Sequence, residues 1–269
     1  MILKKVEIQN EIINLITNEV NKYKSKMDTR GIKNKYEYKT FINAFIIRLK
    51  TSNTWEHISE QSHISKTHLN RVFIEWSDAN IFQNAYKQFL NKYNLFIDNN
   101  EVYIDSTIIM NKYGTRNTTG YNTYECKKHR SNKISVIASR NGIPLGIHVS
   151  NSNVHDINLL LTTLPKRTLF NKLYGDKGYI SKYYKNKLKR NRNIDFVTPF
   201  RKNQKHKLND IDKLNIKNRI RIEHFNALIK QNKCINIRYD RYLEPYIGLV
   251  YLGCINRGLQ IVFNFLYNF

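Results

Sequence analysis

The pattern of apolar residues changes near residue 100, and this change limits the folds that the chain can adopt. Before it, apolar residues recur at spacings of three and four, which predicts helices. After it, short β-rich runs alternate with helical segments. The runs that read as strands are 101–109, 133–139, 144–150, 172–179 and 193–200, and helical patterns cover 156–164, 181–191 and 218–232. This order predicts an α/β fold with a mixed five-stranded sheet, preceded by a helical N-terminal region.

The charge of the chain favours a polyanionic partner. Lys and Arg together number 45 against 21 Asp and Glu, and the formal net charge is +24. Such an excess argues against an ordinary soluble enzyme of small metabolites and favours nucleic acid ahead of an anionic membrane surface. Lys, Asn, Ile and Tyr are all abundant, which is typical of a coding bias. Such a bias would place some lysines at positions where another polar residue would serve equally well.

Residues 54–76 contain a candidate helix-turn-helix. Thr54 and Ser65 are suitable N-caps for two short helices joined by a tight turn. In such a motif the second helix would enter the major groove of DNA. Its exposed face would carry Lys66, Thr67, His68, Asn70 and Arg71. The alternative is an ordinary helical hairpin.

Neither the cysteines nor the chain ends predict secretion or a membrane span. Cys126, Cys234 and Cys254 are too far apart for a paired zinc site, and Cys126 with His129 reads as part of an ordinary hairpin. The N-terminus lacks the apolar core of a signal peptide. Polar residues interrupt the apolar stretch 246–269, so a buried terminal helix is expected there. These features predict an intracellular, reduced protein.

Three acids occupy positions where the predicted fold would bring them together. Asp105 lies inside an apolar strand, where a carboxylate is costly unless it is paired, hydrogen-bonded or bound to a cation. Asp176 lies at the carboxyl end of the fourth strand, where open α/β sheets place their ligands. Glu223 lies on the last helical pattern, in a polar stripe with Arg219 and Lys230. Taken singly, each acid could equally be structural, and the stripe could be routine i,i+4 pairing.

Taken together, the three carboxylates suit a divalent metal site. Carboxylate oxygens and water are the ligands that Mg²⁺ prefers. Two such ions, about 3.5–4 Å apart, can act on the attacking and leaving oxygens of a phosphodiester. The neighbouring Arg219 and Lys230 would then neutralise phosphate oxygens of bound DNA.

Four further residues lie near the predicted site. Asp156 is expected to cap the helix that it opens, and His155 would lie close to the substrate strand. Lys177 either contacts phosphate or is one more solvated lysine. Asp195, at the start of the fifth strand, is the alternative to Asp176 as second metal ligand.

The motifs YIDST, YGDKGY and RIRIEHFNALIK, in this order, resemble the three acidic motifs of DDE transposases, most closely the insertion-sequence IS4/IS5-like group. The segment GIPLGIHVSNSNVHDINLL is similar to the family's segment between its two aspartates. Arg219, Glu223 and Lys230 keep the spacing of the last motif, whereas Ile216 stands where the family has Tyr. The resemblance covers roughly residues 100–260.

This resemblance implies an RNase H-like catalytic domain at 99–269, with a short insertion at 201–217, after a DNA-binding region at 1–98. It implies that Asp105, Asp176 and Glu223 are the catalytic metal ligands, with two Mg²⁺ ions, or Mn²⁺ in their place. The expected activity is cut-and-paste transposition by hydrolysis and strand transfer. The expected partners are double-stranded DNA, as terminal inverted repeats and target, and a second copy of the chain in the DNA complex.

Two other functions stay open at this point. One is a non-catalytic, sequence-specific DNA-binding protein derived from a transposase, and the other is an RNase H-like nuclease. The expected location is the cytoplasm or nucleoid of a prokaryote, or the nucleus or viral factory of a eukaryotic or viral host, with no membrane partner.

Overall fold

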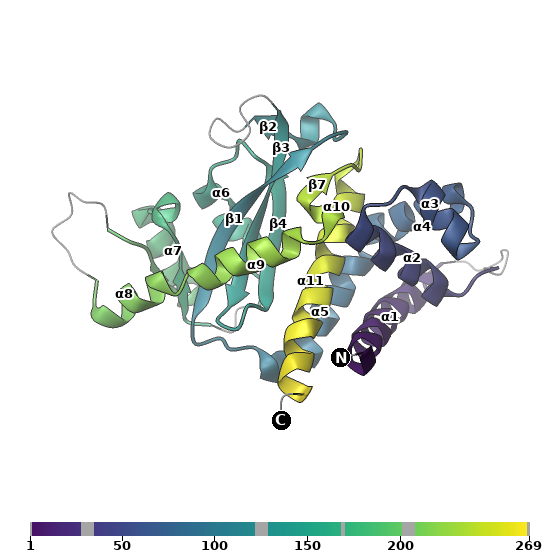
Figure 1. Ribbon diagram of the computed structural model, residues 1–269. Coiled ribbons are helices and arrows are strands. Elements are labelled where there is room, and N and C mark those ends of the chain that lie inside the picture. Colours follow the sequence, from purple (N-terminus) through teal and green to yellow (C-terminus); the bar gives the residue numbers. More distant parts are fainter. Residues whose placement is uncertain (1, 28–34, 122–128, 168–169, 201–207, 268–269) are drawn as a thin grey trace. The chain divides into compact units, whose positions relative to one another are not determined.

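The computed structural model describes residues 2–27, 35–121, 129–167, 170–200 and 208–267, and the chain divides into two compact units (Figure 1). The first unit contains residues 1–94, 112–115 and 229–269. The second contains residues 95–111 and 116–228. Each unit is described by itself below.

The first unit is helical and confirms the helical N-terminal region that the sequence predicts. Its helices pack around an aromatic core in which the rings of Phe45 and Phe73 lie 4.8 Å apart and those of Phe45 and Trp76 5.6 Å apart, both edge to face. A two-residue strand, β7 (Ile237–Arg238), follows the short helix α10. The helices are α1 (Ile2–Lys24), α2 (Tyr38–Thr51), α3 (Trp55–Ser62), α4 (Lys66–Asp78), α5 (Ile81–Lys92), α10 (Lys233–Asn236) and α11 (Leu243–Tyr267).

Helices α3 and α4 form the two short helices predicted at 54–76. Thr54 caps α3 by accepting a hydrogen bond from the backbone N–H of His57, at 3.4 Å. Ser65 caps α4 in the same way through His68, also at 3.4 Å. His63 closes α3 in the left-handed conformation, with φ of 55°, which turns the chain sharply into α4. Both predicted caps are therefore confirmed.

The apolar C-terminal helix α11 packs on α5, α4 and α1. By length and composition it could cross a membrane, but 67% of its most apolar window is buried within the protein. Close packing explains its glycines. A Cβ at Gly258 would lie 2.3 Å from the ring of Phe89, and one at Gly248 would lie 2.7 Å from the hydroxyl of Ser77. The prediction of a buried helix over this segment agrees with that packing.

The second unit is built on a mixed sheet, which confirms the predicted fold class. The order is β2-β3-β1-β5-β6, and β4 also pairs with β3. β3 runs antiparallel to β1, β2 and β4, whereas β5 runs parallel to β1 and β6. The strands are β1 (Val102–Asn111), β2 (Gly120–Tyr121), β3 (Arg130–Ser139), β4 (Pro144–Asn151), β5 (Lys172–Tyr174) and β6 (Asp195–Val197).

Four α-helices accompany this sheet. Helix α6 packs on β3, β4 and β1, and α7 packs on β6. Figure 1 shows α9 as a long green helix that follows α8, and its residues up to Leu228 belong to this unit. The helices are α6 (Asp156–Thr163), α7 (Lys182–Arg192), α8 (Asp210–Lys217) and α9 (Ile220–Lys230), with 3₁₀ turns η1 (Asn94–Phe96), η2 (Arg116–Thr118) and η3 (Lys177–Tyr179).

Two segments differ from the sequence prediction. The run 172–179 is not one strand, because β5 ends at Tyr174 and the turn η3 follows. The predicted insertion at 201–217 contains helix α8, although residues 201–207 lie outside the described residues. Asn209 caps α8, and Asp212 anchors it by accepting hydrogen bonds from Lys172 and from the hydroxyl of Tyr174, both at 3.1 Å.

The two compact units divide first between residues 94 and 95, close to the predicted boundary at residue 98. Residues 229–269 group with the N-terminal helices, because the apolar face of α11 is buried against helices of that half of the chain. The DNA-binding role of the first region and the catalytic role of the second stay predictions.

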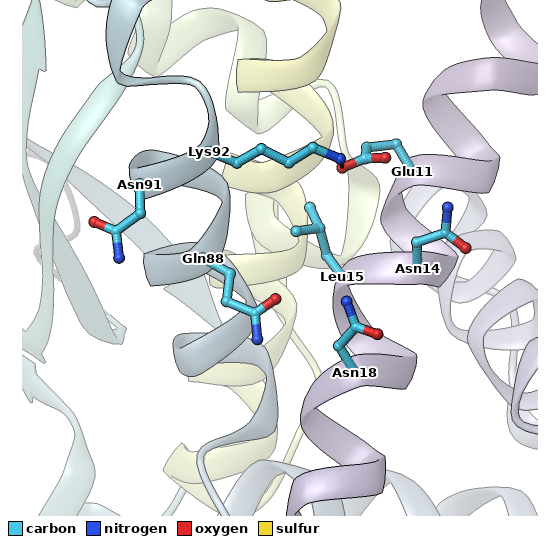
Figure 2. A pocket seen from close by; sticks show the side chains of 7 residues that line it. All are labelled: Glu11, Asn14, Leu15, Asn18, Gln88, Asn91 and Lys92. Atoms are coloured by element: carbon cyan, nitrogen blue, oxygen red, sulfur yellow. Dashed lines mark hydrogen bonds and ion pairs between the residues drawn. The ribbon is translucent and has the colours of Figure 1, made fainter.

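A cavity of about 400 Å³ lies between α1 and α5 in the first unit. Figure 2 shows the side chains that line it. Lys92 of α5 donates a hydrogen bond to Glu11 of α1 at 2.6 Å across one end of it. Its lining residues are Glu11, Asn14, Leu15 and Asn18 from α1 and Gln88, Asn91 and Lys92 from α5. The cavity is a helix–helix groove that a salt bridge spans, and it contains none of the predicted site residues.

Truncating the aromatic core should destabilise the protein strongly. Phe45 is fully buried, so Phe45→Ala removes apolar surface and leaves a cavity, and the free energy of unfolding should fall by about 3–5 kcal/mol. Urea unfolding followed by circular dichroism measures this. Leu95→Ala is the control, because Leu95 is 92% exposed and its loss should change the free energy by less than about 0.5 kcal/mol.

Candidate active site

Asp105 lies in the middle of β1, opposite Val136 of β3. Its side chain is only 17% exposed. Asn226 of α9 donates a hydrogen bond to Asp105 Oδ2 at 3.1 Å, and the guanidinium of Arg219 lies 3.5 Å from Asp105 Oδ1. The buried carboxylate thus has the partners that an acid in an apolar strand requires.

Arg219 also binds the second predicted acid. Its Nη2 donates to Oε1 of Glu223 at 2.6 Å, one turn along the chain. Helix α9 is oriented by Ile222 and Phe225, which are buried, so that Glu223 lies on its more exposed side with 49% of the side chain accessible. One guanidinium therefore joins the carboxylates of Asp105 and Glu223.

Asp176 follows the end of β5, as the sequence predicts. Its Oδ1 accepts a hydrogen bond from the backbone N–H of Gly178 at 2.8 Å and caps the turn η3. A Cβ at Gly178 would lie 3.1 Å from this oxygen, which is closer than side chains normally pack. Glycine at this position therefore leaves room for the Asp176 carboxylate.

Burial and neighbouring charges both act on the pKa of Asp105. Burial raises the pKa of Asp105 from 3.8 to about 6, and the negative charges of Asp176 and Glu223 add to the rise. The charge of Arg219 and a backbone hydrogen bond from Ser106 oppose it. Asp176 and Glu223 thus lie close enough to Asp105 for their charges to act on it.

Asp156 differs from its predicted role. The N-cap of α6 is His155, whose Nδ1 accepts from the N–H of Ile157 at 3.4 Å, so the prediction that Asp156 is the cap is wrong. The reason is that Asp156 has stronger partners outside its own helix. Its Oδ1 accepts from Lys133 Nζ at 2.7 Å and from Ser106 Oγ at 2.6 Å.

Tyr179 is a buried tyrosine whose hydroxyl is affected by three of the acids. The ring is buried beside Gly175 and Phe196. Burial raises the pKa of the Tyr179 hydroxyl, and the charges of Asp156, Asp105 and Asp176 raise it further. The hydroxyl therefore stays protonated and is unsuited to act as a base.

The remaining predicted residues lie around this group or elsewhere. Lys177 is exposed beside Asp176, and Lys230 ends α9 with partial exposure. Lys66, Thr67, Asn70 and Arg71 are exposed on α4, whereas His68 is partly buried against the ring of Phe41, at 5.2 Å.

Asp195 and Asp176 lie at opposite ends of two neighbouring parallel strands, β6 and β5. It pairs in register with Lys172, at the start of β5, and Asp176 follows the end of the same strand. The side chain of Asp195 is 50% exposed and forms an ion pair with Lys189 at 2.9 Å. This position makes Asp195 a poor alternative to Asp176.

The donor set of the site fits a hard divalent cation, although the side chains are not arranged around one. Among the residues that the structure describes, no three His, Cys, Asp or Glu side chains converge closely enough to hold a metal ion. Arg219 lies where its positive charge neutralises two of the three carboxylates. Carboxylate oxygens are ligands that suit Mg²⁺, so the residue types fit the ion. Asp105 and Glu223 are bound to Arg219, however, and at least one of them would have to separate from it before binding a cation.

A family model described as "Transposase DDE domain" matches residues 102–242, which is more than half of the chain. The chain therefore belongs to the DDE transposase family. The match includes all three acids and also Asp156 and Asn226.

Among solved structures, the chain is similar to the piggyBac transposase in a cryo-electron microscopy structure of its synaptic complex with hairpin DNA. The identity is 11% and the TM-score is 0.49, over 96% of this chain and 72% of that chain. No curated protein matches the sequence.

Replacing Asp105 by Asn should stabilise the metal-free protein in a pH-dependent manner. Since folding raises the pKa of Asp105 to about 6, ionisation of this group disfavours the folded state, and the penalty develops as the pH rises from about 4 to above 6. Asp105→Asn removes the penalty, so its free energy of unfolding at pH 8 should exceed that of the wild type by on the order of 2–3 kcal/mol.

The measurement is urea unfolding in EDTA at pH 8 and at pH 4, where the gain should largely vanish. Asp195→Asn serves as the control for an exposed acid and should change little at either pH. A gain for Asp105→Asn that is equal at both pH values would contradict the electrostatic origin.

Proposed function

We propose that this chain is a DNA transposase of the IS4/IS5-like group that cuts DNA at terminal inverted repeats and joins the ends to target DNA. The observation that carries the proposal is the match of a transposase DDE domain model to residues 102–242, a range that includes Asp105, Asp176 and Glu223. These acids come from β1, from the turn after β5 and from α9.

The three acids are the residues proposed to hold two divalent ions, Mg²⁺ or Mn²⁺. Bound ions would supply the positive charge that polarises the scissile phosphodiester and stabilises the leaving oxygen. Asn226 holds the Asp105 carboxylate from α9, and the N–H of Gly178 fixes one oxygen of Asp176. These contacts orient the ligands before any ion binds.

Arg219 has two successive roles in this proposal. In the metal-free protein it neutralises Asp105 and Glu223, and so reduces the repulsion between acids that are close together. If ions occupied the carboxylates, the guanidinium would be free to bind two oxygens of a DNA phosphate in a bidentate manner. Lys177 and Lys230 are proposed to contact neighbouring phosphates as point charges.

The reaction consists of two displacements at phosphorus. In the first, the oxygen of water bonds to phosphorus and the bond to the 3′ oxygen breaks, which leaves a 3′-OH and a 5′-phosphate. In the second, this 3′ oxygen bonds to a target phosphorus, and the target's own 3′ oxygen leaves. Positioning and electrostatic stabilisation suffice for such displacements, so no covalent enzyme intermediate is required.

Recognition of the DNA ends is proposed for the first unit. Helix α4 presents Lys66, Thr67, Asn70 and Arg71 to solvent, and the net charge of +24 favours binding to a polyanion such as DNA. Two transposon ends must be brought together, so the DNA complex is proposed to contain two copies of the chain. The protein would act where the host DNA is located.

Removing any one of the three acids should abolish cleavage while DNA binding persists. Substituting a residue that supports a metal ligand typically lowers metal affinity or activity about 10–100-fold, and losing a ligand itself should cost more. Asp105→Asn, Asp176→Asn or Glu223→Gln should therefore each lower the cleavage rate by more than about 100-fold. The assay uses DNA that carries the ends flanking the gene, with Mg²⁺ and, in parallel, with Ca²⁺.

Asp195→Asn is the matched control, because it removes an acid at the other end of the strands of the same sheet and should leave cleavage unchanged. Wild-type rates in the three variants would sink the assignment of the site. Tight binding to the ends without cleavage under any condition would indicate a non-catalytic DNA-binding protein, and hydrolysis without strand transfer would indicate a nuclease.

Loss of a phosphate-binding cation on α4 should weaken DNA binding and reduce its dependence on salt. Arg71→Ala is expected to lower the slope of log K against log salt concentration by about 1, because one fewer counterion is released. Fluorescence anisotropy with labelled inverted-repeat DNA at several salt concentrations measures the slope. Lys87→Ala is the control, since Lys87 is an exposed cation on α5, outside the helix-turn-helix.

A further inference from the structure

The ion pair between Lys133 and Asp156 is partly buried, and the reaction proposed above does not use it. Lys133 of β3 has only 8% of its side chain exposed, and its ammonium lies 2.7 Å from Asp156 Oδ1 and 2.8 Å from the carbonyl oxygen of Val154. A buried lysine needs such partners, since an unpaired buried charge is strongly destabilising. The pair therefore ties the start of α6 firmly to the sheet.

Asp156 is also tied to the strand that carries Asp105. Ser106 Oγ donates to Asp156 Oδ1 at 2.6 Å, and Ser106 directly follows Asp105 in β1. Successive side chains of a strand point to opposite faces of the sheet. Consistent with this, Asp105 contacts Asn226 of α9, whereas Ser106 contacts α6. Asp156 thus holds β1 from the face opposite to the one that presents Asp105.

The second oxygen of Asp156 lies against the turn that carries Asp176. A Cβ at Gly178 would lie 3.5 Å from Asp156 Oδ2 and 3.1 Å from Asp176 Oδ1. Helix α6 and the turn η3 are in contact along this side. One carboxylate is therefore hydrogen-bonded to Ser106 beside Asp105 and lies close to Gly178 in the turn after Asp176.

We propose that Asp156 is a positioning residue, which, held by Lys133, sets the spacing between the carboxylates of Asp105 and Asp176. It acts through Ser106 and η3 and does not itself touch the substrate. This inference rests on the proposed function, because the spacing matters only if the two acids share metal ions.

The first test uses Ser106→Ala, which removes the hydrogen bond between β1 and Asp156 without changing any charge. The full-length protein without DNA is titrated with Mn²⁺, and free Mn²⁺ is measured by electron paramagnetic resonance. The apparent affinity for Mn²⁺ should weaken by about 10-fold. This is the lower end of the range of about 10–100-fold that is typical when a residue supporting a metal ligand is removed. Ser131→Ala is the matched control, because Ser131 is a buried serine of the same sheet whose hydroxyl donates to Ser152 at 2.7 Å. It should bind Mn²⁺ within twofold of the wild type.

The second test separates positioning from simple electrostatics. Asp156→Asn removes a negative charge near the site, and Lys133→Met removes a positive one. Positioning predicts that both weaken Mn²⁺ binding, by about 10–100-fold. If only the local charge mattered, Lys133→Met would instead tighten it. Asp212→Asn is the matched control. Asp212 is in the same unit and, like Asp156, accepts hydrogen bonds from a lysine and a hydroxyl, here Lys172 and Tyr174, and its loss should leave Mn²⁺ binding unchanged.

Each outcome decides between the proposals. If the wild type binds no Mn²⁺, both the metal-dependent function and this inference fail. If the wild type binds Mn²⁺ and Ser106→Ala and Asp156→Asn bind it equally well, only the positioning role fails. Tighter binding by Lys133→Met, or an equal loss in Asp212→Asn, would also overturn it. Thermal unfolding of each variant confirms that the titrated protein is folded. If Asp156→Asn or Lys133→Met does not fold, the result for Ser106→Ala decides the test.

Discussion

The guanidinium of Arg219, placed between the carboxylates of Asp105 and Glu223, is the interaction on which the arrangement of the candidate site depends. Asp105 is buried in an apolar strand, where its ionised form is stable only beside positive charge or hydrogen-bond donors. Arg219 provides that charge from the turn between α8 and α9, and so joins the strand to the helix. If the site binds divalent cations as proposed, these would replace a cation that the protein itself supplies.

Much of this site could be predicted from local sequence. An acid inside an apolar strand and an acid just after the next strand in the sheet are both visible in the residue pattern, and the charges of Asp176 and Glu223 act on Asp105 in the structure. The contributions of Asn226 and Lys133 could not be predicted in the same way. Each acts on a residue distant in the chain, and a polar position on a helix or strand does not reveal its partner.

The prediction for Asp156 was wrong for an instructive reason. Capping rules consider only the helix itself, and they favour Asp over His at its start. Here a lysine from another strand competes for the carboxylate, and an ion pair with good geometry outweighs a cap. The packing of α11 illustrates the same limit. Its apolar composition predicts burial, but only the complete structure shows that α5, α4 and α1 cover it.

The register between β1 and β3 has a consequence for how relatives of this chain can vary in length. It is continuous from Val102, opposite Ser139, to Met110, opposite Ser131. Inserting or deleting one residue inside β1 would exchange the faces of Asp105 and Ser106, so that neither would reach its present partners. β3 and β4, by contrast, already contain an irregularity between Ile137 and Ala138. We therefore expect length differences among relatives to accumulate at the β3–β4 end and in the loops, and to be absent from β1.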